Sequence, residues 1–287
     1  MGVPGRPLQP SAVSTALRLE APAKLNLSLT VVGRREDGYH LLDTRLVLLE
    51  LADGLLMLPG CSGLRVEGEG RSTLPLDEGN LAWRGLVAGL GAEPDLACLA
   101  LDKRIPVAAG LGGGSSDAAA ARRLGRVWRG LPEGAADEGD MDGLTAIGAD
   151  VPFFAACVAA ARVTGIGEHV EAEVAEPAHV VLAHPSFGIS TAAVFDELHP
   201  DEWGTAENDL LAPARRLRPE LGDLFELVSK AGGTPRLTGS GSTVFTLTAD
   251  PEHAAAIARH LRDAGVRVTL TRTRDAAASI ERIIEED

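Results

Sequence analysis

PVAAGLGGGSSDAAAA, the segment from Pro106 to Ala121, has four glycines among the five residues from Gly110 to Gly114, followed by two serines, an aspartate and a run of alanines. Glycine adopts backbone angles that other residues resist, and its missing side chain lets a bulky group come close. Alanine is the strongest helix former, so a helix is predicted after Ser115. Because the free N–H groups and the dipole at a helix start attract anions, the segment predicts a phosphate-binding loop.

Two common phosphate motifs do not fit this loop. A Walker A motif would end in Gly-Lys-Ser or Gly-Lys-Thr, and no Gly-Lys pair closes these glycines. A dinucleotide fingerprint would space the glycines as G-x-G-x-x-G, whereas here they run together. The alternative is a flexible turn capped by Ser115 or Ser116. Glycines, paired serines and a strong helix former in succession favour the anion site.

Composition narrows the classes of partner. The 287 residues are 45% hydrophobic, which suits a globular protein of one large or two smaller domains. A net charge of −14, with only one tyrosine, three tryptophans and six phenylalanines, argues against a nucleic-acid surface. No apolar run reaches the roughly 18 residues of a membrane helix, and the first sixteen residues predict a loose tail instead of a signal peptide. A cytoplasmic protein with no membrane partner is expected.

Cysteine and lysine are both scarce. The chain has three cysteines: Cys61, Cys98 and Cys157. Their odd number and the lack of a CxxC pair predict buried free thiols, not a disulfide framework or a zinc site. Of the 27 basic residues, three are lysines: Lys24, Lys103 and Lys230. In a chain that otherwise uses arginine, a lysine either marks a place that needs a compact point charge or occurs by chance.

Alternation of apolar and polar residues marks the first element. The pattern predicts a strand over residues 17–32, broken at Pro22. A period of two places Lys24 and Asn26 on the same face. That face is either an ordinary solvated surface or the wall of a cleft.

The next segment, GRREDGYH over residues 33–40, predicts a turn around its Asp-Gly step. It ends in Tyr39, the only tyrosine of the chain, and His40. Loop residues of these types often bind ligands, although a simple surface pair is the more common outcome.

Asp150 lies in GADVPFF, residues 148–154, between a predicted helix end and two phenylalanines. A carboxylate in such apolar company is costly unless it is paired, and Lys24 is a candidate partner. The pair could accept a hydroxyl proton and offset charge on a transferring phosphoryl group. The alternative is an aspartate that caps a helix or stabilises a turn.

The other elements follow from local periodicity. Strands are predicted over residues 45–51, 55–58, 64–67, 96–104, 159–163, 179–183 and 266–271, and helices over 80–90, 141–147, 209–231 and 252–264, with another starting at Ser190. The alanine-rich helix carries four arginines that are expected on a solvated face: Arg122, Arg123, Arg126 and Arg129. This mixture, with no internal repeat, predicts an α+β fold.

The motifs PAKLNLSL, REDGYH, DKRIPVAAGLGGGSSDAAA, GADVPFF and LTGSGS, in this order, resemble the GHMP small-molecule kinase family over residues 17–272. The resemblance implies a two-domain α+β architecture with the active site in the cleft between the domains. It divides the chain into a flexible tail (1–16), an N-terminal ATP-binding domain (17–160) and a C-terminal kinase domain (161–287). It also implies ATP and Mg²⁺, with the metal ligands unassigned, and leaves monomer or homodimer open.

The resemblance also assigns site residues. Lys24 and Asp150 match the catalytic pair, with Asp150 as the proton acceptor. The ATP loop comprises Pro106, Val107, Ala108, Ala109, Gly110, Leu111, Gly112, Gly113, Gly114, Ser115 and Ser116. The substrate-binding set comprises Asn26, Tyr39, His40, Asp150, Thr191, Phe195 and Gly239. In it, Tyr39 and Phe195 would sandwich a cytosine ring, and His40 would hydrogen-bond the edge of that ring.

The pairing of PAKLNL with DGYH is similar to that of family members that phosphorylate the 2-hydroxyl of a cytidine diphosphate-linked methylerythritol in the non-mevalonate isoprenoid pathway. The alternatives are a sister kinase for a mevalonate-type or amino-acid alcohol and a nucleotide sensor without catalysis. One departure from the family pattern is GLPEGAADEGD, residues 130–140, which stands where a longer helix is expected.

Overall fold

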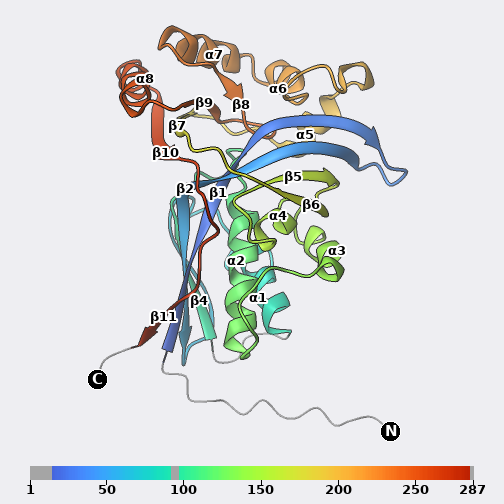
Figure 1. Cartoon of the computed structure of the whole chain (residues 1–287), viewed down its shortest axis with the longest axis vertical. Coiled ribbons are helices and arrows are strands. Elements are labelled where there is room, and N and C mark those ends of the chain that lie inside the picture. The colour runs from blue at the N-terminus through green and yellow to red at the C-terminus, as the bar shows by residue number, and fades with distance from the viewer. Residues whose placement is uncertain (1–14, 92–96, 285–287) are drawn as a thin grey trace.

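The structure is a computed structural model that describes residues 15–91 and 97–284, and it is built on two β-sheets (Figure 1). The first sheet contains β1 (Thr15–Arg34), β2 (His40–Pro59), β3 (Gly63–Gly68), β4 (Ala97–Lys103), β5 (Ala160–Gly165), β6 (His169–Glu173) and β11 (Glu281–Ile284). The second contains β7 (His179–His184), β8 (Arg236–Leu237), β9 (Val244–Thr248) and β10 (Arg267–Arg272). With the helices described below, this confirms the predicted α+β class.

Two long antiparallel strands, β1 and β2, connect the lower and upper parts of the molecule (Figure 1). The break predicted at Pro22 is a bulge within a continuous strand, because the register shifts there without ending the pairing. The strands predicted over 45–51 and 55–58 are likewise one strand. Its first half, residues 42–47, pairs with β5, and its second half, residues 54–59, pairs with β4.

Four helices accompany the first sheet: α1 (Leu81–Leu90), α2 (Gly113–Trp128), α3 (Met141–Thr145) and α4 (Val151–Ala155). Asn80 caps α1, because its side chain accepts a hydrogen bond from the N–H of Ala82 at 3.0 Å. A Cβ atom on Gly85 would overlap the carbonyl oxygen of Ala118, so α1 and α2 are in backbone contact. The sheet and this helix pair enclose one apolar core, which includes Leu55, Leu86 and Leu124.

The prediction of a solvated arginine face on α2 is wrong for Arg122 and Arg123. Both side chains are buried, and they pair with Asp140 and Glu133 respectively. The acidic segment at residues 130–140 supplies both carboxylates. It contains the 3-10 turn η1 (Glu138–Asp140) in place of the longer helix that the family pattern suggested. The acidic charges of that segment therefore compensate the arginines of α2.

The second sheet carries helices on one face: α5 (Thr191–Glu197), α6 (Leu211–Leu217), α7 (Glu220–Lys230) and α8 (Pro251–Asp263), with the 3-10 turn η2 (Pro200–Glu202). The helix predicted over residues 209–231 is two helices, because Pro219 stands at the N-cap of α7. The other face of the sheet packs on the first sheet through residues such as Val180, Leu182 and Phe245. Two cores thus sandwich the second sheet.

Charged contacts add to this packing. Arg267 of β10 pairs with Glu69, and Arg272 pairs with Glu50 of β2 at 2.6 Å.

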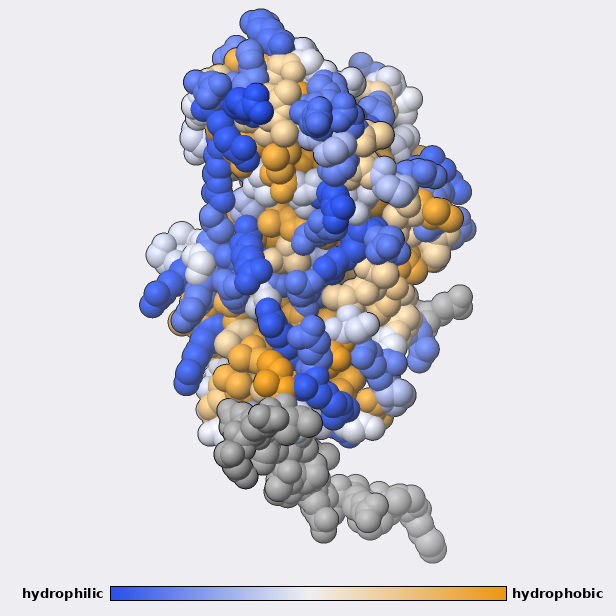
Figure 2. Space-filling view, turned by 60° about the vertical axis from the view of Figure 1, so that its left-hand side comes forward, coloured by the Kyte–Doolittle hydropathy of each residue, from blue (hydrophilic) through white to orange (hydrophobic). Residues whose placement is uncertain are grey.

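On the face shown in Figure 2, hydrophilic residues predominate across the middle of the molecule. Among residues 15–91 and 97–284, no helix is long and apolar enough to cross a membrane.

The change from one sheet to the other falls between β6 and β7. The predicted domain boundary at residue 160 stands at the start of β5, which still belongs to the first sheet, and β11 returns to pair with β1. The domain division remains a prediction. Of the predicted tail, residues 1–14 lie outside the described residues, whereas Thr15 and Ala16 belong to β1 and pair with β11.

The cysteine prediction is wrong for two of the three residues. Cys61 and Cys98 form a disulfide across 37 residues of sequence, and Cys157 is free. The connection from β2 to β3 brings Cys61 beside Cys98 of β4. Because that neighbourhood depends on strand pairing, cysteine spacing alone could not show it.

His184, in β7, is expected to make folding stability depend on pH. Its ring nitrogens lie 3.2 Å from Oγ1 of Thr243 and 3.0 Å from Oγ1 of Thr269. Burial lowers the pKa of His184 from 6.5 to about 4, with Arg267 adding to the shift and Glu69 opposing it. Between pH 6.5 and about 4 the unfolded chain binds a proton that the folded protein does not. The contribution of the neutral His184 to the free energy of unfolding is therefore complete above pH 6.5 and is lost as the pH falls toward 4.

Urea unfolding of wild type and His184→Asn at pH 7 and pH 4.5 measures this effect. Between pH 7 and pH 4.5, we expect the free energy of unfolding to fall by about 2 kcal/mol more in wild type than in the variant. His260→Asn, at an exposed position of α8, is the matched control and should follow wild type. The same pH dependence in wild type and His184→Asn would contradict a buried neutral imidazole.

Candidate active site

The glycine loop connects β4 to α2 and leaves the start of that helix open. The helix begins at Gly113, three residues earlier than predicted, with Gly112 at its N-cap. Neither Ser115 nor Ser116 caps it, since both lie inside the first turn and no side chain caps the N-terminus. The first backbone N–H groups of α2 therefore lack partners within the helix, as an anion site requires.

Two glycines of the loop have positive φ angles, 75° at Gly110 and 70° at Gly112. A Cβ on Gly110 would overlap the carbonyl oxygen of Thr238, which directly precedes a second glycine turn at residues 239–241. A Cβ on Gly112 would lie 2.9 Å from Cγ of Lys24 and 3.1 Å from Cζ of Phe154. Glycine is thus needed both for conformation and for the close approach of three other segments.

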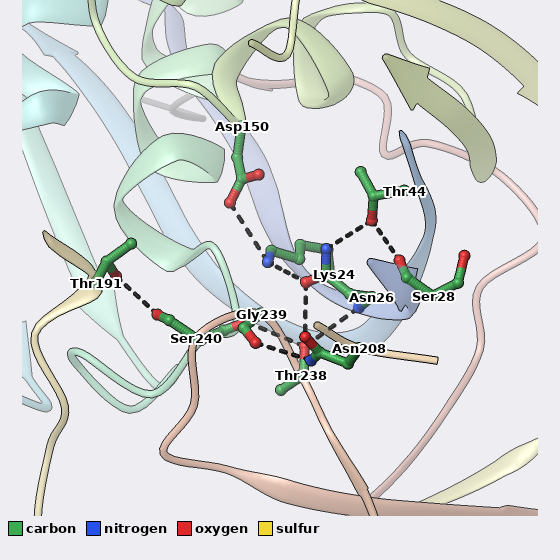
Figure 3. A network of polar contacts seen from close by, with 11 residues as sticks. Lys24, Asn26, Ser28, Thr44, Asp150, Thr191, Asn208, Thr238, Gly239 and Ser240 are labelled. Carbon is green, nitrogen blue, oxygen red and sulfur yellow. Dashed lines mark hydrogen bonds and ion pairs between the residues drawn. The ribbon is translucent and has the colours of Figure 1, made fainter. Parts of the chain in front are cut away.

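The predicted contact between Lys24 and Asp150 is present (Figure 3). Nζ of Lys24 lies 3.4 Å from Oδ2 of Asp150 and donates a hydrogen bond to Oδ1 of Asn26 at 2.6 Å. Lys24 is only 3% exposed, whereas the side chain of Asp150 is 36% exposed. Asp150 occupies the N-cap position of α4 without capping it. Its carboxylate is therefore accessible from solvent while a buried ammonium holds it.

A polar network surrounds this pair (Figure 3). Asn26 donates through Nδ2 to Oγ1 of Thr44 at 2.9 Å, and its backbone N–H donates to Oγ1 of Thr238 at 3.2 Å. Asn208 donates to the carbonyl oxygen of Gly239 at 2.9 Å. Sequence reasoning missed Thr44, Thr238 and Asn208, although Thr238 directly precedes the second glycine turn. These contacts fix the Asn26 side chain. Oγ1 of Thr238 also donates to the carbonyl oxygen of Gly110 at 3.1 Å, which joins the two glycine loops.

Most of the predicted site residues line one cavity of about 510 Å³. They are Lys24, Asn26, Asp150, Thr191, Phe195, Gly239 and residues 106–115 of the loop. Its walls come from elements on both sheets, in agreement with a cleft between two parts of the chain. Thr191 and Ser240 hydrogen-bond through their hydroxyls at 2.8 Å, which ties α5 to the second glycine turn. Of the predicted loop, only Ser116 is not in the lining; its side chain is buried.

The aromatic residues are arranged differently from the predicted sandwich. The ring of His40 stacks on Phe195 with centroids 5.1 Å apart, and Trp203 meets His40 edge-on at 5.8 Å. Tyr39 is 63% exposed and, like His40, lies outside the cavity lining. Burial, assisted by Arg34 and opposed by Asp196, lowers the pKa of His40 below its usual value. His40 therefore covers one face of Phe195, the ring that was predicted to stack on the cytosine.

Metal-binding groups are sparse in this site. Within the described ranges, no three histidine, cysteine, aspartate or glutamate side chains come together in a way that could hold a metal ion. A divalent ion that arrives with a nucleotide can be held largely by phosphate oxygens and water. The fold thus provides no complete metal site of its own in the part that the structure describes.

Comparison with known proteins places these features in a family. The family model described as "GHMP kinases C terminal" matches residues 194–267. The 4-diphosphocytidyl-2-C-methyl-D-erythritol kinase of Granulibacter bethesdensis is 41% identical over 274 residues, which cover 84% of this chain and 88% of that protein. The kinase of the same name from Cereibacter sphaeroides is 38% identical over 276 residues, covering 85% and 94%.

Solved structures of kinases agree with this family in fold. A crystal structure of 4-(cytidine 5'-diphospho)-2C-methyl-D-erythritol kinase has a TM-score of 0.72 and 34% identity, covering 89% of this chain and 98% of its own. Homoserine kinase from Cytophaga hutchinsonii, at 15% identity and a TM-score of 0.63, shares the fold alone; it covers 95% of this chain and 98% of its own. The chain therefore belongs to the GHMP kinase family of small-molecule kinases, among the 4-diphosphocytidyl-2-C-methyl-D-erythritol kinases.

Proposed function

We propose that the protein transfers the γ-phosphoryl group of ATP to the 2-hydroxyl of 4-diphosphocytidyl-2-C-methyl-D-erythritol, giving the 2-phosphate and ADP in the non-mevalonate pathway to isoprenoid precursors. The observation that carries this proposal is the pairing of Lys24 with Asp150 in the cavity beside the open start of α2. The names of the similar kinases support the choice of substrate.

In the proposed reaction, the substrate oxygen attacks the γ-phosphorus as the bond from that phosphorus to the β-phosphate oxygen breaks. Asp150 takes the hydroxyl proton, and ADP leaves with the bonding electron pair. Lys24 holds Asp150 in place and offsets negative charge on the transferring group. The free N–H groups at the start of α2 bind the phosphates.

A kinase of this family uses ATP with a divalent metal ion, and we propose Mg²⁺. When bound with ATP, the ion would neutralise charge on the phosphates. The chain is assigned no metal ligand, and the roles of Lys24 and Asp150 do not depend on one.

Coupled measurement of ADP formation tests the proposal. The purified protein is assayed with MgATP and either the cytidylyl substrate or free methylerythritol. Turnover with the cytidylyl compound alone is the expected result. Turnover with an unrelated alcohol, such as homoserine or mevalonate, would instead identify a sister kinase. ATP binding without turnover of any of these alcohols would point to a sensor.

Tyr39→Ala tests how the cytidine is recognised. Tyr39 follows the Asp-Gly turn of the β1–β2 hairpin, and its exposed ring is free to stack on a base. Because such stacking contributes about 1 kcal/mol or more, we expect the KM for the cytidylyl substrate to rise roughly tenfold. The KM for ATP should change less than about twofold.

Initial rates at varied concentrations of each substrate measure this split. Val174→Ala is the matched control, since Val174 is an 85% exposed apolar residue outside the cavity lining. An equal rise of both KM values in Tyr39→Ala would remove Tyr39 from cytidine recognition.

A further inference from the structure

A buried charge cluster behind the glycine loop has no place in the reaction as described so far. Nζ of Lys103 donates to Oδ2 of Asp117 at 2.6 Å and also to Oδ2 of Asp53. All three residues are at most 4% exposed. They come from three elements: Asp53 from β2, Lys103 from the end of β4 and Asp117 from the first turns of α2. One ammonium group thus joins the strand before the loop to the helix after it.

Asp53 also holds the entry to the loop. Its second oxygen, Oδ1, accepts hydrogen bonds from the backbone N–H groups of Arg104 at 2.6 Å and Ile105 at 2.8 Å. Those two residues directly precede Pro106, where the loop begins. Asp117 holds the exit of the loop through its contact with Lys103. The chain between these two anchors has its position set at both ends.

The cluster lies directly against the proposed phosphate site. Lys103 and Asp117 belong to the lining of the 510 Å³ cavity. A Cβ on Gly113 would lie 3.2 Å from Nζ of Lys103, so the ammonium is packed against the first residue of α2. Two buried oxygens at this helix start, Oγ of Ser116 and Oδ1 of Asp117, have no hydrogen-bond partner among the described residues. The start of the helix therefore has polar groups that its own fold does not satisfy.

Stability alone does not account for this arrangement. Replacing a buried ion pair with apolar residues is often neutral or stabilising, because the attraction between the charges barely offsets the cost of removing them from water. Such a cluster therefore adds little net stability. Burial raises the pKa of Asp117 to about 8, against the opposing effect of Lys103. This raised pKa reduces the negative charge that the cluster places beneath a site for anions. This weakens a repulsion that a second buried carboxylate would impose on a triphosphate.

We propose that Lys103 is a positioning residue for ATP: through Asp53 and Asp117 it fixes the loop and the start of α2 so that the backbone N–H groups converge on the β- and γ-phosphates. This inference rests on the proposed function only in taking ATP as the nucleotide. Lys103 acts through other residues, unlike Lys24, which faces the reacting groups.

Calorimetric titration with a non-hydrolysable ATP analogue and with AMP tests the proposal, because AMP lacks the phosphates concerned. Lys103→Met should weaken binding of the ATP analogue at least tenfold and binding of AMP less than twofold. Asp117→Ala should do the same. Asp117→Asn, which still offers Lys103 an oxygen acceptor, should keep the affinity for the ATP analogue within about threefold of wild type.

Lys230→Met is the matched control, because it removes the same charge from an exposed position on α7. It should bind both ligands like wild type. Equal weakening of ATP-analogue and AMP binding in Lys103→Met, or unchanged affinity for both, would overturn the proposal. If Lys103→Met does not fold, the two Asp117 variants test the proposal. Selective loss of ATP-analogue binding in Asp117→Ala but not in Asp117→Asn would support it, and equal affinities of the two variants for the ATP analogue would overturn it.

The binding experiment separates this inference from the proposed function. No turnover of the cytidylyl substrate, together with selective loss of ATP-analogue binding in Lys103→Met, would reject the substrate and keep the role of Lys103. Turnover with that substrate but no selective loss would reject only the role of Lys103. In the active enzyme, Lys103→Met should raise the KM for ATP more than it lowers kcat.

Discussion

Asp150→Asn is expected to lower kcat at least about 100-fold while the affinity for ATP stays within about threefold of wild type. Asparagine has nearly the same shape, yet it cannot accept the hydroxyl proton. It also removes the charge that Lys24 contacts at 3.4 Å. Because the Asp150 side chain is one-third exposed and caps no helix, the substitution should not disturb folding.

Single-turnover kinetics with saturating ATP and calorimetric ATP binding measure the two quantities separately. Asp263→Asn, at the exposed end of α8, is the matched control and should retain full turnover. Turnover of Asp150→Asn within about threefold of wild type would exclude Asp150 as the proton acceptor. Loss of ATP binding to the same degree as loss of turnover would assign Asp150 a structural role instead.

Local periodicity and capping were sufficient to predict several parts of the site. Alternation along β1 placed Lys24 and Asn26 on one face, and their side chains are hydrogen-bonded to each other. Asn80 and Ser190 were predicted as helix starts, and each caps its helix. These features depend on neighbours a few residues away, so the sequence carries them directly.

Features that depend on distant contacts were not predicted. Asp53 stands in an Ala-Asp-Gly step between two predicted strands, yet it is a buried part of β2 that binds residues more than fifty positions later. The start of α2 at Gly113 is packed against Lys103, which no helix propensity could indicate. The disulfide of Cys61 and the burial of Arg122 have the same cause. In each case the partner is set by sheet pairing or loop packing.

The predicted cytosine site shows a different limit of sequence-based prediction. The family resemblance implied a pocket around a bound base, but in the structure His40 stacks on Phe195 and Tyr39 faces solvent. A sequence pattern that is shared by ligand-binding proteins describes residues in their bound roles.

Lys24→Met should have the largest effect of all, a loss of about 1,000-fold in kcat, because it removes the positive charge that faces the transferring phosphoryl group. Methionine preserves the length and apolar stem of the side chain in a site where lysine is 3% exposed. Lys24→Arg should not restore turnover. Gly112 packs closely against the lysine stem, and a planar guanidinium differs in shape from an ammonium.

The double variant Lys24→Met/Asp150→Asn determines whether the two residues act together. If Lys24 works largely by holding Asp150 and balancing the charge that forms as Asp150 takes the proton, the double variant should be no more than about threefold slower than the slower single variant. Multiplication of the two losses would mean that Lys24 and Asp150 act independently. Turnover of Lys24→Met above one-tenth of wild type would show that the buried ammonium is not needed in the transition state, and the phosphate loop would then carry the electrostatic stabilisation.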